Sequence, residues 1–244
     1  MRSAVVTGAS RGIGRGIALD LARQGWRLTL AARDPARLAA AAAEMTAAGA
    51  SYVERVDVDL ADPEAPATVV AAHAAHHSCL DALVLAAGVG SAAPLHEYPV
   101  HRYDKQFALN TRAPFLLMRE ALPLLRAAAV RQPAHGAKVI ALASIGGVYA
   151  EPSLAVYGAT KAALLALCRG FNAEESAAGV TATAVAPGYV DTDMSAWVHD
   201  AVPPAAMIPV SDVVTAVGAL LSLSARSVVN ELVLSRAGTS GYSA

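Results

Sequence analysis

Short apolar runs alternate along the chain with longer segments in which apolar residues recur every three or four positions. The runs are rich in Val, Leu, Ile and Ala, which is typical of strands buried on both faces of a parallel sheet. The segments between them have the period of amphipathic helices. The runs lie at residues 3–7, 27–32, 51–56, 81–87, 138–143, 180–186 and 231–235. This alternation predicts an α/β fold with helices on both faces of the sheet.

The composition favours one soluble domain over residues 1–244. Of the 244 residues, 55% are hydrophobic, which is enough to cover both faces of a large sheet. No apolar run reaches the ~18 residues that a membrane span needs, and we expect no signal peptide. The formal net charge of -1 provides no basic surplus, so we expect no nucleic-acid partner. Cys79 and Cys168 are isolated thiols, which suits core positions and a reducing cytoplasm.

A glycine-rich turn follows the first run. Gly8, Gly12 and Gly14 have the spacing G-x-x-x-G-x-G and precede a helix that ends near Gly25. Glycines here let the backbone approach a pyrophosphate, whose charge meets free N–H groups at the helix N-terminus. A Gly-rich turn can also be only a tight connection, but its place at the start of a βαβ unit favours dinucleotide binding.

Charged residues near the expected adenosine end indicate which dinucleotide binds. Arg33 ends the second run, and Arg11 precedes a helix N-terminus, where the dipole disfavours a cation and a local anion would compensate it. Together they would bind a 2′-phosphate, so we expect NADP(H) rather than NAD(H). Two solvated arginines are the alternative. Asp34 is the counter-argument, since an acid there would bind a ribose hydroxyl; as N-cap before Pro35, it is expected to face helix N–H groups instead.

The third run ends near Asp57. This carboxylate is a candidate contact for an adenine amino group, and a turn residue before the next helix is the alternative.

The candidate catalytic residues lie between the fifth and sixth runs. Tyr157 and Lys161 stand four residues apart and so share one helix face, where an ammonium lowers the pKa of a neighbouring phenol. Ser144 follows the fifth run, at the sheet edge where open α/β folds bind ligands. A hydroxyl and an acidic phenol at this edge would meet one substrate oxygen. An i, i+4 pair also arises by chance, so the motif depends on the rest of the chain.

Asn110 lies inside a helix expected from about residue 103 to 126. Asn is locally unfavourable in a helix, and Pro114 leaves the Asn110 carbonyl without its usual donor. The pair predicts a functional break in the helix. A surface Asn beside a mild kink is the alternative.

Two further segments allow more than one interpretation. His73 and His77 have the spacing of a zinc pair, but no third ligand is evident, so we expect a solvated helix face and no metal site. Residues at about 189–210 interrupt the alternation of strands and helices. They include Met194 and Trp197, which favours a substrate lid.

The order and spacing of several motifs resemble those of the short-chain dehydrogenase/reductases, in particular the single-domain branch that includes 3-oxoacyl-carrier-protein reductases. The motifs are Thr7-Gly8-x-x-x-Gly12-x-Gly14, Asp57, Ala87-Gly88, Asn110, Ser144, Tyr157-x-x-x-Lys161 and Pro187-Gly188-x-x-x-Thr192. They cover nearly the whole chain. The resemblance implies a Rossmann-type, doubly wound, seven-stranded parallel sheet of order 3-2-1-4-5-6-7, and a homodimer or homotetramer.

The resemblance also implies roles for single residues. Tyr157 would donate the proton, Ser144 would position the substrate oxygen, and Lys161 would lower the Tyr pKa while holding the nicotinamide ribose. Asn110 would hold a water for proton relay at the helix break. The candidate cofactor-binding residues are Gly8, Ser10, Arg11, Gly12, Ile13, Gly14, Arg33, Asp57, Val58, Ala87, Gly88, Asn110, Tyr157, Lys161, Pro187, Gly188, Val190 and Thr192.

Two positions depart from the family pattern. The usual Asn-Asn-Ala-Gly is Leu85-Ala-Ala-Gly88, which loses an Asn near the cofactor region. The usual Asp-Gly-Gly after the last strand is Arg236-Ala-Gly238, which puts a close assignment to the acyl-carrier reductases in doubt.

The favoured function is a cytoplasmic, NADP(H)-dependent reductase that acts reversibly on a small-molecule ketone or aldehyde. The apolar lid residues indicate a medium-sized apolar substrate. A nucleotide-bound sensor or scaffold is the rival, but a sensor needs only the glycine-rich turn and not the four candidate catalytic residues. A sugar-nucleotide epimerase is a weaker candidate, because its substrate domain would need more C-terminal chain.

Overall fold

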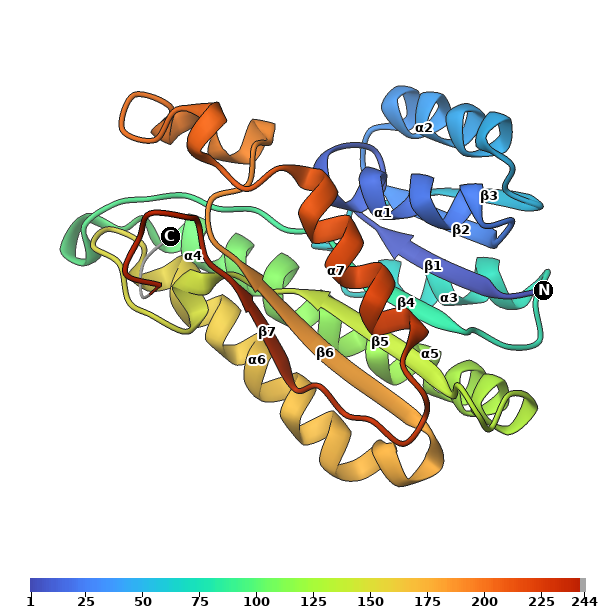
Figure 1. Cartoon of the computed structure of the whole chain (residues 1–244). Coiled ribbons are helices and arrows are strands. Elements are labelled where there is room, and N and C mark those ends of the chain that lie inside the picture. The colour runs from blue at the N-terminus through green and yellow to red at the C-terminus, as the bar shows by residue number, and fades with distance from the viewer. Residues whose placement is uncertain (242–244) are drawn as a thin grey trace.

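The computed structural model describes residues 1–241, so residues 242–244 of the expected domain lie outside the described part. The described chain forms a parallel seven-stranded sheet of order β3-β2-β1-β4-β5-β6-β7, with helices on both faces (Figure 1). The predicted fold class and strand order are confirmed.

The strands follow the predicted apolar runs closely. Every residue of β1, β4, β5 and β6 is buried, including the few polar ones, as expected for strands covered on both faces. The strands are β1 (Ser3–Thr7), β2 (Arg27–Ala32), β3 (Tyr52–Asp57), β4 (Ala82–Leu85), β5 (Ala137–Leu142), β6 (Val180–Pro187) and β7 (Glu231–Leu234). β4 is shorter than expected because the N–H groups of Ala86 and Ala87 donate to the Thr7 hydroxyl (3.1 and 3.2 Å). The chain therefore leaves the sheet two residues early.

Two apolar cores lie on opposite faces of the sheet. Val5 of β1 belongs to the core under α3, α5 and α6, and the next residue, Val6, belongs to the core under α1, α2 and α7. The helices are α1 (Gly12–Arg23), α2 (Pro35–Ala48), α3 (Ala65–Ala74), α4 (Val100–Phe107), α5 (Ala113–Arg131), α6 (Ala155–Glu175) and α7 (Val210–Ser222). Among residues 1–241, no helix combines the length and apolar character needed to cross a membrane.

The helix predicted at about 103–126 spans a longer region and is broken where Asn110 lies. A π-helical turn, Ala108–Arg112, separates α4 from α5. Asn110 is 1% exposed, so the alternative of a surface Asn is wrong. Its side chain accepts a hydrogen bond from the Val89 N–H (2.9 Å) and donates one to the Val89 carbonyl (2.8 Å). The break thus turns a buried amide toward the loop after β4.

The segment between β6 and α7 contains short 3₁₀ turns at Asp193–Val198 and Pro204–Ala206 and projects from the sheet (orange in Figure 1). A parallel bridge between Val190 and Ile208 joins its two ends. Trp197 is 60% exposed. The segment is therefore held at its base while its apolar tip faces outward.

His73 of α3 and His77, which follows the end of this helix, are both buried, so the predicted solvated face is wrong. His73 is fully buried, with its ring nitrogens 2.9 Å from the Thr29 hydroxyl and 3.2 Å from the Cys79 carbonyl. The His77 ring packs 4.8 Å from the His73 ring. Tertiary packing explains the difference, because this face of α3 packs against the sheet. In residues 1–241, no three His, Cys, Asp or Glu side chains are grouped to hold a metal ion.

The buried His73 predicts a loss of stability in acid. Burial lowers its pKa from 6.5 to about 4, since the ring is held neutral. This contribution to stability is present above pH 6.5 and is lost as the pH falls from 6.5 toward about 4. Between about pH 7 and about pH 4, the free energy of urea unfolding of the wild type should fall by ~3 kcal/mol more than that of His73→Gln. His76→Gln, which removes a half-exposed ring, is the control and should keep the wild-type pH slope. Equal slopes for wild type and His73→Gln contradict the prediction.

Cys79 and Cys168 are both buried, as expected for core positions. Burial raises the pKa of the Cys168 thiol to about 12, so it stays protonated at neutral pH.

Candidate active site

The carboxyl ends of the strands open on a cavity of about 820 Å³. All the predicted catalytic and cofactor-binding residues except Asp57 and Asn110 line it. Asp57 is exposed at the end of β3, and the neighbouring Asp59 lines the cavity in its place. The predicted residues, which come from the whole length of the chain, therefore meet at one place.

The glycine-rich turn forms one wall of this cavity. A Cβ at Gly14 would lie 2.4 Å from the Gly8 carbonyl oxygen, so only glycine allows the turn to fold this tightly. The N-cap of α1 is Arg11, which makes no side-chain capping bond. The first N–H groups of α1 therefore have no capping side chain, and Gly12, Ile13 and Gly14 beside them line the cavity.

The end of β2 presents arginines to the same cavity. Asp34 caps α2, accepting from the Arg37 N–H at 3.0 Å, as predicted, and its other oxygen lies 3.5 Å from Arg37 Nε. Arg33 is exposed and lines the cavity, and so does Arg37. Sequence analysis missed Arg37, although its position in the first turn of the helix that follows Arg33 was a usable signal.

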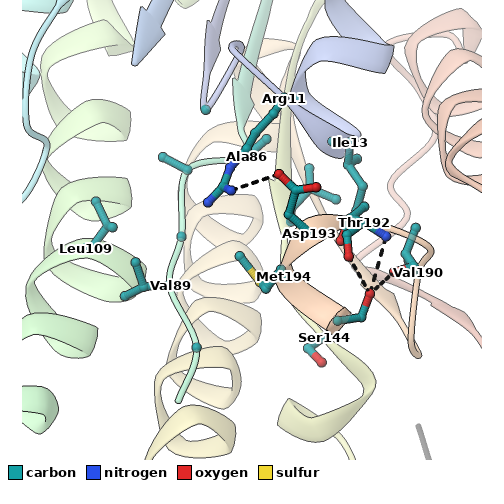
Figure 2. A pocket seen from close by; sticks show the side chains of 18 of the residues that line it. Arg11, Ile13, Ala86, Val89, Leu109, Ser144, Val190, Thr192, Asp193 and Met194 are labelled. Carbon is teal, nitrogen blue, oxygen red and sulfur yellow. Dashed lines mark hydrogen bonds and ion pairs between the residues drawn. The ribbon is translucent and has the colours of Figure 1, made fainter. Parts of the chain in front are cut away.

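Arg11 forms an ion pair with Asp193, with 3.1 Å between Nη1 and Oδ2 (Figure 2). The local anion expected beside Arg11 at the start of α1 is thus, in this structure, the Asp193 carboxylate. Both side chains are more than half exposed, so the pair contributes little stability. It does join the glycine-rich turn to the segment after β6.

Ser144, Tyr157 and Lys161 lie together at the cavity wall formed by β5 and α6. Ser144 is the residue before the 3₁₀ turn Ile145–Gly147, and its hydroxyl accepts from the Gly146 N–H at 3.2 Å. Lys161 Nζ donates to the Leu142 carbonyl at 2.7 Å and lies 5.7 Å from the centre of the Tyr157 ring. The end of β5 therefore fixes both Ser144 and the Lys161 ammonium.

The electrostatics differ from the sequence prediction. Burial raises the pKa of the Tyr157 phenol, and a hydrogen bond with Ser144 opposes this rise only in part. Burial also lowers the pKa of Lys161 to about 8. The predicted lowering of the Tyr157 pKa is therefore not seen in this structure, because desolvation of the phenol is the largest effect on it. The phenol is protonated at neutral pH.

Asn110 stands behind the cavity rather than in its wall. Besides both Val89 backbone groups, its amide binds the Thr160 hydroxyl at 3.1 Å. Thr160 is next to Lys161 in α6, and a Cβ at Gly88 would lie only 3.2 Å from Asn110 Oδ1. Asn110 thus ties the loop after β4 to the helix that carries Tyr157.

The remaining wall is mainly apolar, with a few polar groups that sequence analysis did not predict. Figure 2 shows Val89 and Leu109 on one side and Met194 on the other. Tyr189 packs edge-on against Trp197, with 6.1 Å between ring centres, and its hydroxyl donates to Glu151 at 3.4 Å. Burial and the Glu151 charge raise the pKa of Tyr189 to about 12.

The chain is similar to known oxidoreductases over most of its length. The model of the short chain dehydrogenase family matches residues 2–202. The 2-(R)-hydroxypropyl-CoM dehydrogenase of Xanthobacter autotrophicus is 35% identical over 206 residues, which are 80% of this chain and 77% of that protein. The 3-oxoacyl-[acyl-carrier-protein] reductase FabG of Staphylococcus aureus is 31% identical over 199 residues, which are 82% of this chain and 78% of that protein.

A solved structure extends the match to nearly the whole fold. The structure of a metagenomic short-chain oxidoreductase in complex with NADP has a TM-score of 0.81 and 32% identity, covering 96% of both chains. With a family match over most of the sequence and curated relatives above 30% identity, this protein belongs to the short-chain dehydrogenases, a family of oxidoreductases.

Proposed function

We propose that this protein is an NADP(H)-dependent enzyme that interconverts a carbonyl compound and a secondary alcohol. The observation that carries the proposal is the meeting of the Ser144 and Tyr157 hydroxyls with the Lys161 ammonium at one cavity wall. A carbonyl oxygen placed between two hydroxyls can accept a hydrogen bond from one and a proton from the other. The related structure in complex with NADP supports the choice of cofactor class.

The cavity fits a dinucleotide. The turn at Gly14 is a cradle that a Cβ would fill, and the uncapped start of α1 suits a pyrophosphate. When bound, the nicotinamide would supply or accept the hydride. Lys161 would hold its ribose, and the residues that would surround the nicotinamide half are Pro187, Gly188, Val190 and Thr192.

The protonation states suit carbonyl reduction at neutral pH. Burial keeps the Tyr157 phenol protonated, so it is ready to give a proton to the substrate oxygen, which Ser144 would orient. In the opposite direction Tyr157 would have to lose its proton first, so alcohol oxidation should need a higher pH. Asn110 would act as a positioning residue and would leave its carbonyl free for a proton path at the helix break.

The lid and the assembly are parts of the same proposal. Residues 189–210 would close over the substrate, with the Arg11–Asp193 pair at the edge of the cavity.

Ala162 and Ala166 of α6 are exposed beside one another, and Phe115 of α5 is 45% exposed. Pairing of these faces between two copies would bury them, so light scattering should report a dimer or tetramer. A monomer at micromolar concentration contradicts the proposed assembly.

Arg33 is expected to decide between the two cofactors. With Arg37 close to it in sequence and cavity, it would bind a 2′-phosphate, and a charge-assisted hydrogen bond of this kind contributes ~1.5–3 kcal/mol. In Arg33→Asp, the ratio of kcat/KM for NADPH to that for NADH should fall by ~10- to 100-fold. Arg23→Asp, at the far end of α1, is the control and should keep the ratio. A wild type that favours NADH, or an unchanged ratio in Arg33→Asp, overturns the NADP(H) assignment.

A sensor or scaffold remains the rival function. The deciding experiment measures NADPH oxidation against a panel of ketones, β-ketoesters and quinones. Turnover that depends on Tyr157 supports the enzyme. Tight NADPH binding without turnover of any carbonyl supports the sensor.

A further inference from the structure

The loop between β4 and α4 passes the Tyr157 ring at Gly90 and continues into a serine that lines the cavity. A Cβ at Gly90 would lie 3.5 Å from two carbons of that ring, and the next residue, Ser91, lines the cavity. The Ala93 N–H donates to the Ser153 carbonyl at 3.0 Å, which holds this loop against the one that precedes α6. Ser91 therefore sits at a fixed position near the candidate proton donor.

Two buried or half-buried side chains hold the Ser91 hydroxyl. Its oxygen lies 2.6 Å from the Tyr98 hydroxyl. Gln106 of α4, which is 2% exposed, donates from Nε2 to Ser91 Oγ at 3.3 Å and also to the Tyr98 hydroxyl. Neither Tyr98 nor Gln106 lines the cavity. The three side chains thus form a small network behind the wall, of which only the serine reaches the cavity.

Counting donors and acceptors shows which hydroxyl proton the network leaves available to the cavity. Gln106 Nε2 uses one acceptor site on each hydroxyl, and each hydroxyl still has one proton to donate. The Tyr98 proton can go to Ser91 Oγ or to the Ser91 carbonyl, 3.5 Å away. With Tyr98 donating to Ser91, the serine proton has no acceptor within the network and is available to the cavity.

The burial of Gln106 indicates that the network has a function beyond packing. Among residues 1–241 its Oε1 has no hydrogen-bond partner, although the side chain is almost completely buried. Burying an unsatisfied amide oxygen costs ~1–3 kcal/mol, whereas an apolar residue at this position of α4 would cost nothing comparable. The orientation of two hydroxyls by Nε2 is a reason to keep the glutamine.

We propose that Ser91 donates a hydrogen bond to a second oxygen of the substrate, and that the substrate is therefore a carbonyl compound with another oxygen acceptor close to the reacting carbon, such as a keto ester or diketone. This inference rests on the proposed function. Gln106 and Tyr98 act as positioning residues that direct the serine proton into the cavity. The apolar side chains of Val89, Leu109 and Met194 surround the rest of the substrate.

The test compares two substrates of similar size, ethyl acetoacetate and 2-hexanone, with NADPH. The measured quantity is the ratio of kcat/KM for the keto ester to kcat/KM for the ketone. Loss of one hydrogen bond to the substrate corresponds to ~10-fold or more, so Ser91→Ala and Tyr98→Phe should lower the ratio by that factor. Ser91→Thr keeps a hydroxyl and should keep the ratio. Ser227→Ala, an exposed serine outside the cavity, is the control.

Each outcome decides the matter. A lower ratio in Ser91→Ala and Tyr98→Phe, with the ratio kept in Ser91→Thr, supports the inference. An unchanged ratio, or equal losses on both substrates, overturns it while the proposed function stands. If Ser91→Ala does not fold, Tyr98→Phe decides alone. A wild type that binds NADPH but reduces neither compound overturns the proposed function and this inference together.

Discussion

The Tyr157→Phe variant is expected to lose ~10²- to 10⁴-fold in kcat while its dissociation constant for NADPH stays unchanged. The phenol hydroxyl is the proposed proton donor, and burial keeps it protonated near neutral pH. The ring itself only packs, against the backbone at Gly90, and Phe preserves that contact. The measurement is kcat for the best ketone of the panel at saturating NADPH, together with cofactor binding by fluorescence.

Tyr103→Phe is the matched control for this experiment. Tyr103 is a 44% exposed residue of α4 outside the cavity, so removing its hydroxyl should leave kcat unchanged. Near-wild-type kcat in Tyr157→Phe contradicts the catalytic assignment as a whole, because the proposal gives the role of the acid beside Ser144 to the Tyr157 hydroxyl.

The Gly147→Ala variant is expected to lose ~10²-fold in kcat. A Cβ at Gly147 would lie 2.7 Å from the backbone carbonyl carbon of Lys161, so the turn that follows Ser144 rests directly on the backbone of α6. An alanine must push the turn and the helix apart, and a displacement of about 1 Å between reacting groups can cost ~10² in rate. The measurement is kcat with saturating NADPH on protein whose circular dichroism shows the native fold.

Gly170→Ala tests whether this effect is specific. Gly170 lies on the same helix, but a Cβ there would meet no heavy atom within 4 Å. Alanine in an open helical position stabilises by up to ~1 kcal/mol, so this variant should keep kcat and gain stability. If Gly147→Ala folds and works as well as Gly170→Ala, then close packing of the turn on α6 is not what places Ser144.

The fold and much of the site could be predicted because their signals are local. A short, mainly apolar run such as 180–186, rich in β-branched residues, is typical of a strand covered on both faces, and the structure buries every residue of β6. The Gly8-to-Gly14 turn and the Tyr157–Lys161 spacing are likewise short-range patterns. The Asn110–Pro114 pair predicted the helix break from the chemistry of two nearby residues.

What could not be predicted depends on long-range packing. Arg11 and Asp193 are 182 positions apart, so no local pattern connects them. The raised pKa of Tyr157 results from burial, which spacing on a helix does not reveal. The spacing between His73 and His77 is the same on a solvent-exposed face and on a buried face. Only the packing of α3 determines that these side chains are buried.

The bridge between Val190 and Ile208 also bears on how this enzyme family can diversify. The Asp191 N–H donates to the Ile208 carbonyl at 3.0 Å, and the Ile208 N–H donates to the Tyr189 carbonyl at 2.9 Å. The ends of the intervening loop are thus already closed, and lengthening a closed loop costs entropy only as the logarithm of its length, ~0.6 kcal/mol per doubling. Insertions between residues 191 and 207 can therefore reshape this wall of the cavity without shifting the register of β6 or the start of α7.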